Sequence, residues 1–409
     1  MKLTASLCGL AFATMVSYAV AGSAAQSLFL SAYGAEALPY AWLAVAAASI
    51  VATTCIQSLS ERLDIAQLFA LGCRVSGVTL TGILLLALVA PKPAAFCLYV
   101  WKDVYIIVLV ELFWTLANIV FGMHSASRAY GLFCAAGSLG GVAGALALGR
   151  GARLLGTQNS LWTLLPLLAG VGWGCGRLVR HTPIPSPKRR GEGVGAWHAL
   201  GTLRASLVLP ALLLLVVNAQ GWLTLLDFRY SAAVLQLEPG AEGRTALIAN
   251  VNALINAISF PLQMATGPIL RLLGGPLTLA LVPLAAVASL TCVTASHGAP
   301  LVVCAAQVAG KSLDYSLFRA VKEMVYIPLG YAEKTQGKAF IDILSYRAVK
   351  GLVSATLLLL GFLGLAHEAA LPLLWLFGAA WLLSAGWLLR RMRAHPGLRT
   401  SFFGSLRRL

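Results

Sequence analysis

Long apolar segments alternate with short polar segments along almost the whole chain. A helix needs about 20 mainly apolar residues to cross a hydrocarbon core of roughly 30 Å, and most of these segments reach that length. They are rich in leucine and alanine and lack the residue-by-residue alternation that a membrane β-barrel requires. The pattern therefore predicts an all-α polytopic membrane protein.

We expect about twelve transmembrane helices, in two six-helix halves. The first set covers residues 4 to 30, 38 to 58, 68 to 90, 95 to 121, 129 to 149 and 160 to 179. The second set covers residues 205 to 227, 244 to 265, 274 to 296, 299 to 327, 338 to 366 and 370 to 390. The predicted domains are an N-terminal half at 1–180, a basic cytoplasmic linker at 181–203, a C-terminal half at 204–392 and a basic cytoplasmic tail at 393–409. This organisation is typical of a major-facilitator-like architecture.

Charge supports a membrane location and indicates an orientation. Of the 409 residues, 59% are hydrophobic and only 11% are charged, so water is not the main solvent of this chain. The formal net charge of +16 would favour nucleic-acid binding in a soluble protein. Here most Lys and Arg residues lie in the loops and termini that fall on the cytoplasmic side when successive helices cross the membrane in opposite directions. We predict a multi-pass protein of a bacterial inner membrane, with both termini cytoplasmic, the lipid bilayer as a partner and no nucleic acid.

The sequence contains no motif of a common enzyme. All eight cysteines occur singly in or near apolar segments, and no His/Cys cluster has metal-ligand spacing. Neither GxSxG, HExxH nor a phosphate-binding loop occurs. The glycine-rich stretch from Gly137 to Gly149 lies inside a predicted span, so we interpret it as a close-packing helix face. We predict a protein that is not an enzyme and needs no cofactor and no metal.

Charged residues inside the predicted tenth helix are the strongest functional signal. A charge near the middle of a bilayer costs a few kcal/mol and usually faces a partner or an aqueous path. Lys322 and Glu323 allow a second interpretation, as solvated or ion-paired residues at the cytoplasmic helix end. One helical face is predicted to hold Lys311, Asp314, Tyr315, Phe318 and Lys322.

The fourth and eleventh predicted helices carry further charges. In the fourth, Lys102 and Asp103 are either functional or a pair at the outer rim. In the eleventh, Arg347 and Lys350 share a face that suits phosphate groups, unless Asp342 pairs with Arg347 to hold the helices together. We interpret Asp227 and Arg229 as solvated residues at an outer helix end, and Arg74 as reaching the cytoplasmic surface. A broad face of the fourth helix, predicted to meet the cavity, holds Asp103, Glu111, Trp114 and Asn118.

Two segments resemble the ATP/ADP translocase family of plastids and intracellular bacteria. The first is KEMVYIPLGYAEKTQGKAFIDILSYRAVKG, which starts at Lys322 and includes Lys338. The second is ELFWTLANIVFGMHSASRAYG, which carries Trp114, Asn118 and Arg128. The first helix departs from the family pattern, because Ala24, Ala25 and Gln26 replace expected charges. The resemblance implies twelve helices, alternating access and a nucleotide substrate, with a less charged nucleotide or another anion as an alternative.

These observations lead to one functional hypothesis and two rivals. We expect a secondary transporter of a nucleotide or similar phosphorylated anion, which works by exchange or by proton symport. Lys311, Lys322, Arg347 and Lys350 would attract the anion, and Glu111 or Glu323 would carry a proton or form state-specific ion pairs. The first rival is a major-facilitator-type carrier of a non-nucleotide solute. The second is a membrane interaction protein that does not transport.

Overall fold

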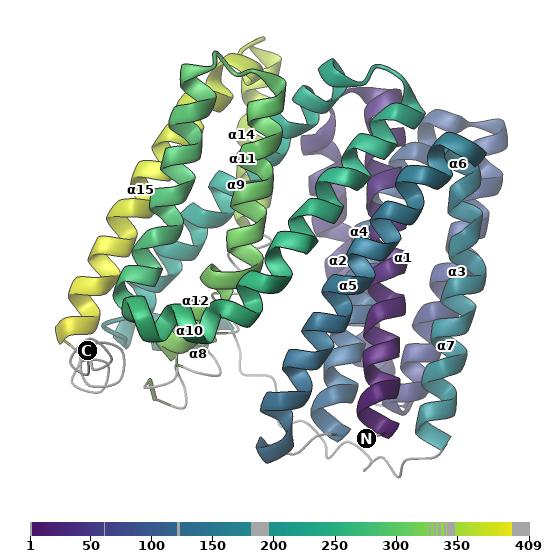
Figure 1. Ribbon diagram of the computed structural model, residues 1–409, viewed down its shortest axis with the longest axis horizontal. Coiled ribbons are helices and arrows are strands. Elements are labelled where there is room, and N and C mark those ends of the chain that lie inside the picture. Colours follow the sequence, from purple (N-terminus) through teal and green to yellow (C-terminus); the bar gives the residue numbers. More distant parts are fainter. Residues whose placement is uncertain are drawn as a thin grey trace. The chain divides into compact units, whose positions relative to one another are not determined.

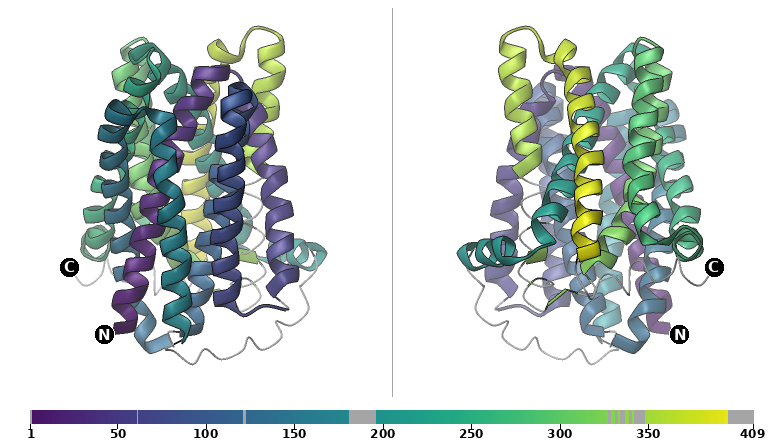
Figure 2. Two further views of the ribbon diagram at one scale, coloured as in Figure 1. Left: turned by 90° about the vertical axis from the view of Figure 1, so that its right-hand side faces the viewer. Right: turned by 90° about the vertical axis from the view of Figure 1, so that its left-hand side faces the viewer.

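The computed structural model describes residues 2–60, 62–120, 123–180, 196–326, 329–330, 333, 337–338, 341 and 348–394. Helices contain most of these residues, and no strand occurs among them. Figure 1 labels the helices, and Figure 2 shows them from two further sides. The predicted all-α polytopic class is confirmed.

The helices of the N-terminal part follow one another through short turns. They are α1 (Lys2–Tyr33), α2 (Leu38–Ser60), α3 (Ile65–Val89), α4 (Pro91–Val120), α5 (Met123–Leu155), α6 (Thr157–Ser160), the 3₁₀ turn η1 (Leu161–Thr163) and α7 (Leu164–Arg180).

The remaining α-helices vary more in length, from 8 residues in α12 to 55 in α10. They are α8 (Ala196–Ala205), α9 (Leu209–Leu237), α10 (Ala241–Ala295), α11 (Pro300–Leu313), the π-helical turn η2 (Asp314–Phe318), α12 (Arg319–Tyr326), α14 (Val349–Phe362) and α15 (Ala366–Ala394). Each predicted span overlaps one of these helices. For the span predicted at 338 to 366, residues 339–340 and 342–347 lie outside the described residues.

Among the described residues, 8 helices are long and apolar enough to cross a membrane. One of them, α10, has 55 residues and would be about 82 Å long if it were straight. Gly274 divides it, because its φ of 71° and ψ of 163° are not helical and suit a residue without a Cβ atom. The ribbon of α10 changes direction along its course (Figure 1). This helix therefore holds both spans predicted at 244 to 265 and 274 to 296.

Contacts between residues divide the chain into two compact units. Unit 1 contains Met1–Gly191 and Val234–Ala257, and unit 2 contains Glu192–Ala233 and Ile258–Leu409. Of the predicted linker, residues 181–195 lie outside the described residues and the remainder lies in α8. The domain boundaries given above stay a prediction.

Unit 1 depends on close packing between α1 and the glycine-rich part of α5. A Cβ atom on Gly144 would lie 2.6 Å from the carbonyl oxygen of Val16, and one on Gly140 would collide with the carbonyl oxygen of Phe12. Small residues let two helix backbones approach this closely. The interpretation of the stretch from Gly137 to Gly149 as a packing face is confirmed.

The Gly144 contact predicts a loss of stability on substitution. We expect Gly144→Val to lower the free energy of unfolding by roughly 1–3 kcal/mol, because the new side chain overpacks the backbone of α1. Gly131→Val is the matched control, since it places the same residue in the same helix where no atom lies within 4 Å of a Cβ. Thermal unfolding in detergent measures the difference. Equal melting temperatures for the two variants would contradict the close contact.

Asparagine side chains of α10 add hydrogen bonds within unit 1. Asn252 Nδ2 donates to Ser23 Oγ over 2.9 Å. The Asn256 side chain fills the space above Gly141, where a Cβ atom would lie 2.9 Å from its Oδ1. These contacts give both asparagines a role in helix packing.

Aromatic rings form part of the core of unit 2. The ring of Trp381 in α15 lies 6.0 Å from that of Trp222 in α9 and 5.4 Å from that of Phe318 in η2. Gly310 in α11 lets Trp222 approach, since a Cβ atom there would lie 2.9 Å from the indole. This packing holds α9, α11 and η2 together, which are the elements that carry the charges described next.

Candidate functional site

An ion pair joins α11 to α9 within unit 2. Lys311 Nζ lies 2.9 Å from Asp227 Oδ2, and the Gln307 side chain donates a hydrogen bond to the other carboxylate oxygen. The exposed fractions of the Lys311 and Asp227 side chains are 19% and 28%. A charge inside an apolar helix needs such a partner, so Asp227 and Lys311 stabilise one another.

The prediction that Asp227 and Arg229 are solvated residues at an outer helix end is wrong. In the structure α9 continues to Leu237, and both side chains are partly buried. Arg229 donates a hydrogen bond to the carbonyl oxygen of His367 over 3.4 Å. The sequence does hold a sign of this pairing, because Asp227 is the only acidic residue in the apolar sequence of α9.

A buried acidic residue, Asp314, lies near the Lys311–Asp227 pair. Asp314 is 7% exposed, and its carboxylate interacts electrostatically with Lys311, Arg319 and Lys322. Lys322 in α12 is 5% exposed. The structure therefore brings three predicted site residues, Lys311, Asp314 and Lys322, together with Asp227.

The π-helical turn η2 lies within the predicted helical face. Asp314 and Phe318 are buried, whereas Tyr315 is 38% exposed. Tyr315 interacts electrostatically with Lys311, a second residue of that face. A π turn has more residues per turn than an α-helix and is frequent at functional sites. The Gln263 side chain of α10 donates a hydrogen bond to the backbone carbonyl of Tyr315 over 3.2 Å. This bond satisfies a carbonyl group in the turn.

Glu323 and Lys338 form a second ion pair. Lys338 Nζ lies 2.5 Å from Glu323 Oε2 and 5.6 Å from the centre of the Tyr326 ring. The exposed fractions of the two charged side chains, 35% for Lys338 and 42% for Glu323, are larger than those of the Lys311 pair. An exposed pair of this kind contributes little to stability and is easily broken.

The predicted cationic residues of the eleventh helix are only partly described. Lys350 lies in α14, where its side chain is half-buried and its carbonyl oxygen accepts a hydrogen bond from Ser354 Oγ over 2.6 Å. Asp342 and Arg347 lie outside the described residues. Their predicted pairing with one another, and the phosphate-binding face with Lys350, stay predictions.

Helix α4 in unit 1 carries a buried pair of adjacent residues. Lys102 Nζ lies 2.8 Å from Asp103 Oδ1, with exposed side-chain fractions of 9% and 16%. The same ammonium group lies 4.1 Å from the centre of the Tyr99 ring, whose hydroxyl accepts a hydrogen bond from Trp42 Nε1 over 3.0 Å. Lys102 is thus held by both a carboxylate and an aromatic face.

The other predicted residues of α4 differ in environment. Glu111 is exposed, and Trp114 is half-buried with its ring 5.4 Å from that of Tyr130. The Tyr130 hydroxyl donates a hydrogen bond to Asn118 Oδ1. Trp114 and Asn118 therefore contact the same tyrosine of α5. Arg128 belongs to α5 as well, but its side chain lies outside the described residues.

Comparison with known proteins connects this cluster to a family. Residues 252–391 match the model of the TLC ATP/ADP transporter family, and this region contains Lys311, Lys322 and Lys350. Over 289 residues the chain is 25% identical to ADP,ATP carrier protein 1, chloroplastic, of Arabidopsis thaliana. That alignment covers 61% of this chain and 46% of the relative, so the chain matches less than half of that protein's length.

Solved structures of transporters share the fold. The nucleoside transporter NupG has a TM-score of 0.63 and 12% identity, with 99% of both chains covered. A D-xylose-proton symporter has a TM-score of 0.64 and 12% identity, with 94% of this chain and 96% of that chain covered.

The fold thus defines a polytopic helical membrane protein whose architecture is shared with solved transporter structures. The matched proteins are named as transporters and carriers, which supports the prediction that the chain is not an enzyme. Within this class, residues 252–391 resemble the TLC ATP/ADP transporter family, and the alignment shows a likeness to a chloroplast ADP,ATP carrier. The predicted family resemblance is confirmed.

Proposed function

We propose that this protein is a secondary transporter, which moves a nucleotide or a similar phosphorylated anion across a bacterial inner membrane by alternating access. The observation that carries the proposal is the family match at residues 252–391, which encloses the partly buried Lys311 and the buried Lys322. The chloroplast relative is named as a carrier of ADP and ATP, which supports a nucleotide as the substrate class.

The charges around Asp314 favour an anionic substrate. Lys311, Arg319 and Lys322 interact with Asp314, and Asp227 is the other acidic group of this cluster. Three cationic side chains therefore lie around this carboxylate among the described residues, and cations near an apolar helix attract an anion. Phosphate groups form strong charge-assisted hydrogen bonds with Lys and Arg. We propose that a phosphate group of the substrate interacts with Lys311 and Lys322.

Exposed acidic residues supply candidates for coupling. Glu323 is part of the half-exposed pair with Lys338, and Glu111 is exposed in α4. We propose that the Glu323 pair forms in one transport state and opens in another, or that one of these carboxylates carries a co-transported proton. We also propose that both termini are cytoplasmic, because the distribution of Lys and Arg favours that orientation in the membrane.

Uptake by bacterial cells that express the chain tests the substrate class. The panel contains labelled ATP, ADP, AMP, adenosine and a neutral sugar, each with and without an excess of unlabelled nucleotide. We expect saturable uptake of at least one nucleotide, which the other nucleotides inhibit. Uptake of only the neutral compounds, without inhibition by nucleotides, would overturn the proposal.

A less charged substrate is the second candidate. Ala24 and Ala25 stand where the family resemblance leads us to expect charges, and both are fully buried in the core of unit 1. Fewer cations would favour a nucleoside monophosphate or another singly phosphorylated anion over ATP. In the same panel this candidate predicts faster uptake of AMP than of ATP, whereas the reverse order would contradict it.

A further inference from the structure

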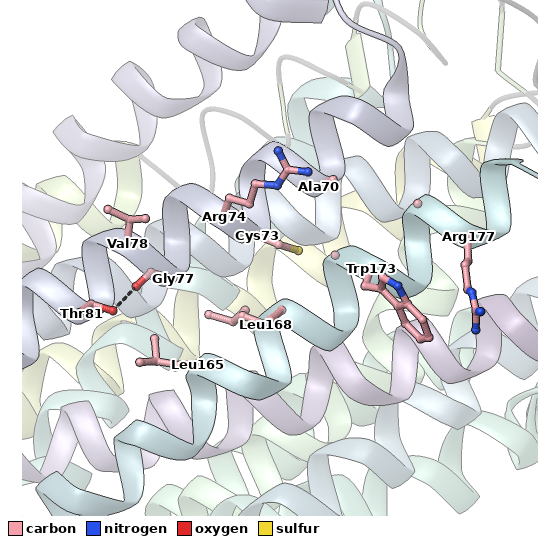
Figure 3. A pocket seen from close by; sticks show the side chains of 13 residues that line it. Ala70, Cys73, Arg74, Gly77, Val78, Thr81, Leu165, Leu168, Trp173 and Arg177 are labelled. Atoms are coloured by element: carbon pink, nitrogen blue, oxygen red, sulfur yellow. Dashed lines mark hydrogen bonds between the residues drawn. The ribbon is translucent and has the colours of Figure 1, made fainter.

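A groove between α3 and α7 lies within unit 1, apart from the charged residues described above. Its volume is about 690 Å³. Figure 3 shows Cys73 and Arg74 on one of these helices and Trp173 and Arg177 on the other. Neither the family resemblance nor the proposed transport function makes use of this groove.

Small residues leave the space that forms the groove. Gly77 of α3 and Gly176 of α7 both line it, and no atom lies within 4 Å of a Cβ built on either glycine. At the level of Gly172 the two helices touch, since a Cβ atom there would lie 3.1 Å from the Cβ of Cys73. The helices thus meet at one level and leave an open channel beside it.

The sides of the groove are apolar and open outward. Leu165 and Leu168 line it from α7. Val78 from α3 is 72% exposed, and Trp173 from α7 is 63% exposed. In a polytopic membrane protein, exposed apolar side chains of this kind face lipid chains. The groove therefore has the chemistry to hold an acyl chain.

Two guanidinium groups line the same groove. Arg74 and Arg177 are both exposed, and the Arg177 guanidinium lies 4.2 Å from the centre of the Trp173 ring. No acidic residue occurs among the described residues that line the groove. Because the Cys73 level of α3 meets the Gly172 level of α7, Arg74 and Arg177 are separated by only about 9 Å along the helix axes.

The chain order places the end of the groove that Arg177 lines near a membrane surface. Arg177 lies in the last turn of α7, which ends at Arg180, and the rule that cytoplasmic segments carry Lys and Arg puts this end in the cytoplasmic leaflet. Anionic phospholipids give that leaflet its negative surface potential. Guanidinium groups bind phosphate through two parallel hydrogen bonds, and a tryptophan is typical of the headgroup level.

We propose that this groove binds an anionic phospholipid. The phosphodiester headgroup interacts with Arg74 and Arg177, and one acyl chain occupies the apolar channel over Gly77 and Gly176. A soluble phosphate compound would leave the channel and its exposed apolar sides without a partner. The proposal goes beyond transport and is independent of which solute the protein carries.

Native mass spectrometry of the purified full chain tests this site. The protein is given equal amounts of phosphatidylglycerol and phosphatidylcholine, and the retained lipids are counted. We expect a preference for phosphatidylglycerol that falls about thirtyfold in Arg74→Gln/Arg177→Gln, since each of the two basic residues near the surface contributes about 1 kcal/mol. Lys92→Gln, which neutralises an exposed cation elsewhere in unit 1, retains the preference.

A second pair of variants tests the acyl channel. Gly77→Leu places a side chain in the channel from a position where no atom lies within 4 Å of a Cβ. We expect it to lose bound phosphatidylglycerol while the melting temperature in lipid-free detergent stays unchanged. Gly82→Leu is its control, because it lies in the same helix, also has no atom within 4 Å of a Cβ and does not line the groove. Retention of lipid by Gly77→Leu at the level of Gly82→Leu would overturn the proposal.

Two further results would also overturn it. One is the absence of any preference for phosphatidylglycerol in the unmodified chain, or a preference that survives in Arg74→Gln/Arg177→Gln. The other is displacement of the lipid by soluble glycerol phosphate at equal concentration, which would mean that the two arginines form a phosphate site without a role for the channel.

Discussion

We expect Lys311→Gln to lower the initial rate of saturable nucleotide uptake by at least about tenfold. The substitution removes a cation proposed to contact phosphate, and a charge-assisted hydrogen bond contributes about 1.5–3 kcal/mol, which corresponds to a rate factor of ten or more. It also leaves the Asp227 carboxylate without its ion-pair partner at 2.9 Å. Uptake by cells with equal amounts of membrane-inserted protein measures the effect.

A double variant separates binding from helix packing. Asp227→Asn/Lys311→Gln removes both charges, and an asparagine oxygen still accepts the hydrogen bond from Gln307. We expect the double variant to regain the melting temperature that the single Lys311 variant loses, without regaining uptake. Recovery of uptake in the double variant would mean that Lys311 serves only as an inter-helix ion pair.

The second large effect is expected at Lys322. This ammonium group is 5% exposed and lies among charged residues of η2 and α12. We expect Lys322→Gln to raise the KM for a nucleotide by about tenfold, because a hydrogen bond to a charged group is lost. The loss should be larger for ATP than for AMP, since ATP carries more negative charge. Initial uptake rates over a range of concentrations provide the KM values.

Two variants control for general effects of charge and packing. Arg271→Gln neutralises an exposed cation within the family-matched region and should leave the KM unchanged. Lys322→Arg keeps the positive charge and should retain part of the affinity. A loss at Lys322 that is equal for ATP, AMP and adenosine would contradict a contact with phosphate.

Apolar segment length was sufficient to predict most of the fold. Each helix that crosses a membrane must satisfy its own backbone groups, so its length and its apolar composition appear directly in the sequence. The backbone leaves the helical region at Gly274, which is the first residue of the span predicted at 274 to 296. The glycine-rich face of α5 was predictable for the same reason, because close helix packing requires small residues.

The partners of the charged residues were harder to predict. A helical face follows from spacing, but the ion pair of Asp227 with Lys311 joins two helices whose relative rotation the sequence does not specify. Spacing also assumes a regular helix, so it did not predict the π turn at Asp314–Phe318. The environment of Asp227 was predicted wrongly because tertiary contacts, and not local sequence, determine it.

The first helix differs from the family pattern at two positions where a charge would be costly to bury. Ala24 and Ala25 have no exposed surface, and they pack in the hydrophobic core of unit 1. A charge introduced at either position would have to be buried, which is costly without a partner. We therefore propose that phosphate recognition depends on cations of other helices, among them the partly buried Lys311 and the buried Lys322 of the described cluster in unit 2.

Transport by the purified protein is the most direct test of nucleotide transport. Proteoliposomes that contain only this chain are loaded with unlabelled ADP, or left empty, and labelled nucleotide is added outside with and without a proton gradient. The proposal predicts saturable uptake that internal nucleotide or the gradient accelerates, and that Lys311→Gln lowers by at least about tenfold. Correctly inserted protein that takes up no nucleotide under any of these conditions would contradict it.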